Sequence, residues 1–155
     1  MIGVFLYYSK VTNSTMLVAL STISPEQENT TKITTKKVKK FLIFAASYQD
    51  AIVTYHASDI ILACHSNALH LNETKARSWV GGNCFLSENG ETTRNNGSVL
   101  NTDQIIKVVM TLEAEVEIKA MYENNRKSLP QTITPIERGH QQPKTSMQTD
   151  NLAVK

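Results

Sequence analysis

The chain changes character at Ala51, and this change limits the folds open to it more than any other feature. Before it, apolar residues recur at helical spacing over residues 2–23 and 34–47. After it comes the apolar run 60–64, which is typical of a strand covered on both faces. We therefore predict a helical domain over residues 1–50 and an α/β domain with a mixed α+β sheet over residues 51–155.

The helical part is expected to hold two or three helices. Asn13 and Ser14 interrupt the first apolar pattern, and Ser14 could cap a second helix that starts at Thr15. The polar stretch 24–31 contains Pro25 and reads as a connection. The third helix is then expected over 34–47.

The second part predicts the order strand, strand, strand, helix, helix, strand. We expect β-forming residues at 52–55 and strands near 60–64, 78–87, 99–110 and 145–149, with helices over 112–127 and 132–139. Pro130 is expected to end the first of these helices and Gly139 the second. Gly81 and Gly82 weaken the second strand and mark a bulge or a close backbone approach.

The composition of the chain excludes few classes of protein. A chain of 155 residues can bury a core, and a net charge of +2 is too small to argue nucleic-acid binding from charge alone. The apolar run 2–8 is too short to span a membrane and resembles no signal peptide, so we expect an intracellular protein without a membrane partner. Cys64 and Cys84 are expected to be free thiols, with one disulfide as the alternative.

Lysines gather at the start of the third predicted helix. Most often such a run is a solvated face, although it stands at the end of the helix that the dipole disfavours. Contact with a phosphate backbone is the more specific interpretation. The candidate nucleic-acid-binding residues are these lysines together with two basic residues near the second strand: Lys36, Lys37, Lys39, Lys40, Lys75 and Arg77.

Acidic residues stand where three separate elements could bring them together. Carboxylates that converge from strand ends and a facing helix can hold two Mg²⁺ ions, which clamp the attacking and leaving oxygens of a phosphodiester. Glu117, with Glu115 as the other register, lies on the long helix, and Asp150 follows the last strand. By spacing alone this pattern is weak, because such glutamates equally form a solvated helix face.

The amino-acid sequence around these acidic positions is more specific than their spacing. It resembles the ribonuclease H region of copia-type retrotransposon polyproteins in the following segments: Ile60-Ile61-Leu62-Ala63-Cys64-His65-Ser66-Asn67-Ala68, Lys75-Ala76-Arg77-Ser78, Gly81-Gly82, Phe85-Leu86-Ser87, Asn96-Gly97-Ser98-Val99-Leu100-Asn101, Gln104-Ile105-Ile106-Lys107, the stretch 114–122, and Met147-Gln148-Thr149-Asp150-Asn151. Upstream, Leu6-Tyr7-Tyr8, Ser14-Thr15-Met16-Leu17 and Lys39-Lys40-Phe41-Leu42 resemble the helices that close the reverse transcriptase of the same polyproteins.

The resemblance implies a ribonuclease H-like fold, with catalytic and metal-binding roles at Asn67, Glu117 and Asp150. Asn67 falls on the first metal-bridging aspartate, Glu117 on the helix glutamate and Asp150 on the third carboxylate. The family's fourth acidic position and its last strand would lie beyond Lys155, so we expect a domain truncated after its fourth strand. The implied cofactor is Mg²⁺, and the implied partner is an RNA–DNA hybrid or another nucleic acid.

Asn67 argues against activity. Its amide is nearly the shape of a carboxylate but is neutral, and its NH₂ group turns donors toward a cation. Losing one charged ligand is expected to slow turnover by several powers of ten, since each 1.36 kcal/mol is tenfold. We therefore expect an inactive or nearly inactive relative of enzymes that cut RNA in RNA–DNA hybrids. A non-catalytic nucleic-acid-binding module and a structural or interaction domain are the alternatives.

Overall fold

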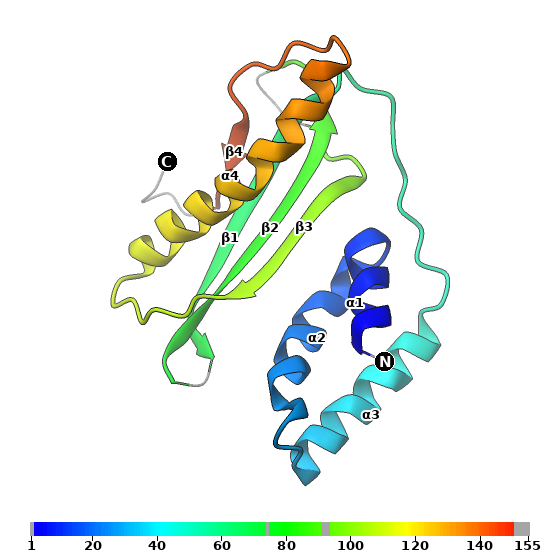
Figure 1. Cartoon of the computed structure of the whole chain (residues 1–155), viewed down its shortest axis with the longest axis vertical. Helices are drawn as coiled ribbons and strands as arrows, with labels where there is room; N and C mark the ends of the chain where they lie inside the picture. The colour runs from blue at the N-terminus through cyan, green and yellow to red at the C-terminus, as the bar shows by residue number, and fades with distance from the viewer. Residues whose placement is uncertain (1, 74, 91–93, 151–155) are drawn as a thin grey trace. The chain divides into compact units, whose positions relative to one another are not determined.

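The computed structural model describes residues 2–73, 75–90 and 94–150, which form two compact units, Met1–Val53 and Thr54–Lys155 (Figure 1). We call them the helical unit and the sheet unit. Their assignment to the end of a reverse transcriptase and to a ribonuclease H domain stays a prediction.

The helical unit contains α1 (Ile2–Val11), η1 (Ser14–Met16), α2 (Leu17–Ile23), η2 (Ser24–Gln27) and α3 (Lys32–Ser47). The predicted break at Asn13 and Ser14 is confirmed, but Ser14 does not cap the second helix. Instead it opens a 3₁₀ turn, and the Asn13 side chain accepts a hydrogen bond from the Thr15 hydroxyl at 2.5 Å.

A capping box fixes the start of α3. The Thr34 backbone N–H donates to the Thr31 hydroxyl at 3.1 Å, and the Thr31 N–H donates to the Thr34 hydroxyl at 3.3 Å. These bonds satisfy two backbone donors that the first turn leaves unpaired. The helix therefore begins two residues before the predicted start.

Apolar packing holds the helical unit together. Phe41 of α3 lies against Met16, Leu20 and Ile23, and all four are buried. The Phe5 ring of α1 meets the Phe41 ring edge to face, with 5.0 Å between the centroids. Phe41 thus contacts both other α-helices of the unit.

The sheet unit is a mixed α/β structure with four strands, in the order β3-β2-β1-β4: β1 (Ile61–Glu73), β2 (Arg77–Ser87), β3 (Ser98–Ile105) and β4 (Ser146–Gln148). The first three strands pair antiparallel, and β4 pairs parallel with β1. The predicted mixed sheet is thereby confirmed. The structure has no strand at residues 52–55, and it ends the third strand five residues before the predicted end.

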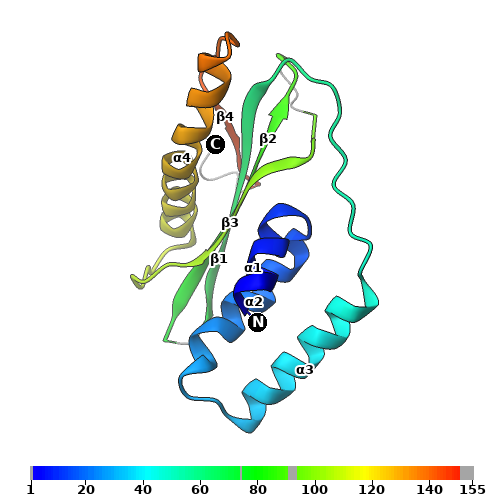
Figure 2. The same cartoon turned by 45° about the vertical axis from the view of Figure 1, so that its right-hand side comes forward.

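One long helix, α4 (Glu113–Glu137), lies along one face of the sheet (Figures 1 and 2). Its Val116 and Ala120 pack on Val80 of β2 and on Ile106, and all four are buried. The predicted stop at Pro130 is wrong, because Pro130 and Pro135 both lie inside this helix. Each proline removes one hydrogen bond, but the turns on either side stay helical.

Buried residues flank the first proline of α4, since Ser128 before it and Pro135 after it are both buried. Gly139 ends the helical region as predicted, with a φ of 87° that favours glycine. The sequence therefore predicts the end of the helical region correctly, but splits one helix into two.

Cys64 and Cys84 form a disulfide, so the prediction of free thiols is wrong. The pairing of β1 with β2 sets the two residues directly opposite each other, with Cα atoms 4.1 Å apart. Both are buried on the side of the sheet where Leu62 packs. The sequence leaves this disulfide open as the alternative but cannot show that it forms, because its formation depends on the register of two strands.

Candidate metal site at the edge between β1 and β4

The candidate site lies where β1 and β4 separate. Their parallel pairing ends at His65 and Gln148, whereas β1 runs on to Glu73. Asn67 and Asp150 each lie two residues beyond this last pair. Two of the three predicted site positions therefore follow the carboxyl end of a parallel strand pair, where α/β sheets commonly place ligands.

Glu117 reaches this edge from α4. Its side chain is buried, with an exposed fraction of 3%. The carboxylate accepts a hydrogen bond from the backbone N–H of Ala68 in β1. The Thr149 hydroxyl, one residue beyond β4, donates to Oε2 of Glu117 at 3.4 Å. The carboxylate therefore bridges the two diverging strands.

The surroundings of Glu117 disfavour its charge. Burial is the main cause that raises the pKa of this carboxyl, and the negative charges of Asp150 and Glu113 raise it further. The Ala68 N–H and the Thr149 hydroxyl act in the opposite direction. A cation bound between Glu117 and Asp150 would relieve both the burial cost and the repulsion.

Glu115 takes a different position. It is exposed in the first turn of α4, and its Oε2 accepts hydrogen bonds from the Leu112 N–H at 3.3 Å and from the Thr111 hydroxyl at 3.4 Å. These bonds cap the helix start. Of the two registers left open by the sequence, the geometry places only Glu117 at the strand edge.

Asn67 stands beside this edge as an exposed residue of β1. Its neighbours Ser66 and Ala68 lie on the α4 side, so strand alternation turns the Asn67 side chain to the other side of the sheet. Asn67 nevertheless directly precedes Ala68, whose N–H holds Glu117. Among the described residues, no group of three or more His, Cys, Asp or Glu could hold a metal ion.

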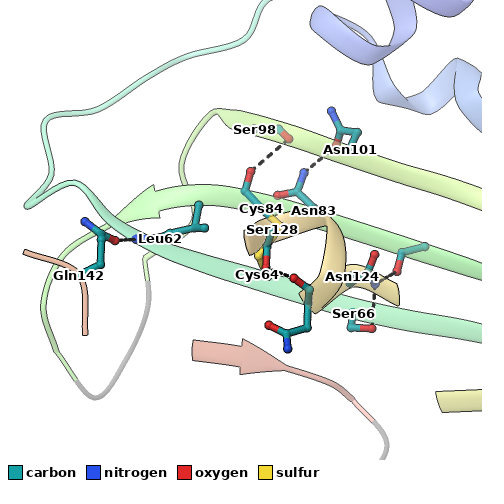
Figure 3. Close-up of a disulfide and its surroundings, with 12 residues drawn as sticks. Leu62, Cys64, Ser66, Asn83, Cys84, Ser98, Asn101, Asn124, Ser128 and Gln142 are labelled. Atoms are coloured by element: carbon teal, nitrogen blue, oxygen red, sulfur yellow. Dashed lines mark hydrogen bonds between the residues drawn. A yellow bond between two sulfur atoms is a disulfide. The ribbon is translucent and has the colours of Figure 1, made fainter. Parts of the chain in front are cut away.

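A polar contact that sequence reasoning missed joins α4 to the two central strands. The Asn124 amide donates to the Ser66 hydroxyl and to the Gly81 carbonyl, both at 2.9 Å (Figure 3). Asn124 is 1% exposed, and a Cβ on Gly82 would lie 2.2 Å from its Oδ1. The close approach that the glycine pair predicted is therefore real. Asn124 lies two turns after Glu117 on the same helix, and this spacing is the sequence feature that could have indicated the contact.

The predicted nucleic-acid-binding residues fall in both units. In α3, Lys36, Lys39 and Lys40 are exposed, whereas Lys37 forms an ion pair with Glu26 at 2.5 Å.

In the sheet unit, Lys75 is exposed in the tight turn after β1, with a φ of 62°, and Arg77 is half-buried at the start of β2. These two residues therefore belong to a different unit from the four lysines of α3.

Comparison with known proteins finds no match: no family model, no curated protein and no solved structure resembles the chain closely enough to be counted. Within the described residues, no helix is both long enough and apolar enough to cross a membrane.

Proposed function

We propose that the chain is a ribonuclease H-like module of copia-type retrotransposon descent that binds RNA–DNA hybrids and has lost most of its hydrolytic activity. The observation that carries this proposal is the buried Glu117 carboxylate at the β1/β4 edge, close to Asp150. The resemblance implies one acidic position on the first strand, one on the helix and one at the end of a later strand. Asn67, Glu117 and Asp150 occupy these three places.

The strand arrangement supports the same proposal. Three antiparallel strands followed by a helix and a parallel strand bring the first and last strands side by side. This arrangement brings the carboxyl ends of the β1 and β4 pairing to one edge of the sheet, two residues before Asn67 and Asp150. A helix carboxylate packed over the same edge then completes a set of hard oxygen donors, which suit Mg²⁺.

Glu117 and Asp150 would hold the cation, and Asn67, whose side chain strand alternation turns away from α4, would add neither a charge nor a ligand there. A bound Mg²⁺ would supply charge stabilisation to the phosphodiester. Glu117 needs to be ionised to bind, and its surroundings favour the protonated form. A site with two carboxylates in place of three binds Mg²⁺ more weakly, which is the physical reason for the proposed loss of activity.

The test is Mg²⁺-dependent cleavage of a fluorescently labelled RNA–DNA hybrid by the wild-type chain, Asn67→Asp, Asn67→Ser and the double variant Asn67→Asp/Glu117→Gln. We expect Asn67→Asp to raise the cleavage rate by on the order of a hundredfold. Asn67→Ser, which adds no charge, should not, and Glu117→Gln should cancel the gain. A folded Asn67→Asp variant with no Mg²⁺-dependent gain would remove Asn67 from the proposed site.

The exposed lysines favour a second candidate function, hybrid binding without cleavage. Lys36, Lys39, Lys40 and Lys75 are exposed cations, and A-form duplexes can be bound through phosphates and 2′-hydroxyls without catalysis. We expect binding of the hybrid to weaken with salt, and the triple variant Lys36→Gln/Lys39→Gln/Lys40→Gln to reduce that salt dependence. Absence of binding at low salt would favour an interaction domain unrelated to nucleic acid.

A further inference from the structure

The helical unit contains an apolar groove that the proposed site does not use. The groove has a volume of about 450 Å³ and runs between α2 and α3. Its apolar lining comes from η1, α2 and α3: Met16, Ala19, Ile23, Phe41 and Phe44. All residues that line it belong to the helical unit.

The floor and the rim of the groove differ in chemistry. Met16, Ile23 and Phe41 are buried core residues, so the floor is rigid and apolar. Lys37 and Lys40, one turn apart on α3, also line the groove. Lys37 is paired with Glu26, whereas Lys40 is an exposed ammonium four residues before Phe44 and so lies on the same helix face as Phe44.

We propose that this groove binds a long-chain aliphatic anion, with the chain on the apolar floor and the anionic head at Lys40. Small-molecule sites are commonly apolar concavities of about 300–1,000 Å³ with a few polar groups that fix orientation. The groove meets both conditions. The charge of its rim selects the sign of the ligand, because both charged side chains in the lining are lysines.

Two neighbouring lysines distinguish binding in the groove from binding that depends only on the overall positive charge of the helix. Lys39 is the immediate neighbour of Lys40, is equally exposed, and is not part of the lining. The variants Lys40→Gln and Lys39→Gln therefore remove the same charge from the same helix. A ligand seated in the groove distinguishes them, whereas one drawn only by net charge does not.

The experiment is titration calorimetry of the full-length chain with laurate, below the concentration at which laurate forms micelles. We expect saturable binding of one laurate per chain, weakened about tenfold by Lys40→Gln and unchanged by Lys39→Gln. Ala19→Trp should abolish binding by filling the groove, whereas Ala46→Trp, an exposed position outside the lining, should not. Far-UV circular dichroism establishes that each variant keeps its helices.

The sign of the head group gives a second, independent readout. Dodecylammonium has the same chain length and the opposite charge, so we expect it to bind at least about tenfold more weakly than laurate. Equal binding of the two amphiphiles, or equal effects of Lys40→Gln and Lys39→Gln, would overturn the proposal. So would laurate binding that survives Ala19→Trp unchanged.

Discussion

The helical unit and the sheet unit are stabilised in different ways. The helical unit depends on one apolar cluster around Phe41, with neighbours supplied by helices close in sequence. The sheet unit joins strands far apart in the chain and buries polar groups between them, among them Ser66, Glu117 and Asn124. Apolar packing thus supplies the main contacts between the helices of the first unit, whereas buried hydrogen bonds and a disulfide also join the elements of the second.

Removing the Phe41 side chain should give the largest difference in stability between the helical unit and the sheet unit. We expect Phe41→Ala to destabilise the helical unit by about 3–5 kcal/mol, because loss of this buried ring leaves a cavity in the core. Hydrogen exchange followed by mass spectrometry should show α1 to α3 losing protection while β1 and β2 keep it. Phe44→Ala, at a partly exposed ring, is the milder control. Equal loss of protection in both units would contradict the separation.

Removing the disulfide should act on the sheet unit instead. We expect the Cys64→Ala/Cys84→Ala variant to lower the free energy of unfolding by about 3 kcal/mol, because the cross-link closes a loop of about 20 residues. Denaturant unfolding, with and without a reductant, measures this change in the wild-type chain. An unfolding midpoint that reduction leaves unchanged would show that the disulfide does not stabilise the sheet unit.

The polar contact under α4 can be tested by a pair of variants. Gly82→Ala should cost about 2 kcal/mol, since the new methyl group would overlap the Asn124 amide. In an Asn124→Ala background the same change should cost much less. Gly90→Ala is the matched control, because nothing lies within 4 Å of a Cβ at that position. Additive costs in the double variant would show that the two residues do not interact.

Glu117 should make the sheet unit less stable as pH rises. Its pKa in the folded state lies above the ordinary value of 4.5, so the folded state holds the proton more tightly than the unfolded state. The stabilisation is complete below 4.5 and is lost as pH rises through the raised pKa. We expect Glu117→Gln to increase the free energy of unfolding by about 1 kcal/mol at neutral pH and not in acid.

Glu115→Gln is the matched control for this pH dependence, since Glu115 is exposed on the same helix and glutamine also serves in a capping box. It should leave the pH profile of the unfolding free energy unchanged. A wild-type profile that matches that of Glu117→Gln would contradict the placement of the buried carboxylate.

The sequence predicts local features of both units better than long-range ones. The break at Asn13 and the stop at Gly139 follow from local backbone preferences, and the structure confirms both. Pro130 misleads because tertiary packing on Ser128 and Pro135 carries the helix past it. The disulfide and the contacts of Asn124 depend on which strands pair and in what register, which no local pattern encodes.

The candidate site likewise combines features that the local sequence predicts with features that depend on long-range contacts. Glu117 and Asp150 are found from their motifs, but the Ala68 N–H and the Thr149 hydroxyl that hold the Glu117 carboxylate come from the fold. A buried glutamate in the second turn of an amphipathic helix is ordinarily unexpected, because charged side chains there usually face solvent. Its burial therefore adds information that spacing alone lacks.

The most direct test of the cation site is the pKa of Glu117, followed by carboxyl ¹³C NMR in the absence and presence of Mg²⁺. We predict a pKa above the ordinary range of glutamate without the metal, since burial and Asp150 disfavour the charge. Millimolar Mg²⁺ should lower the pKa in the wild-type chain, and lower it further in Asn67→Asp. A pKa of Glu117 that Mg²⁺ leaves unchanged in both chains would contradict the site.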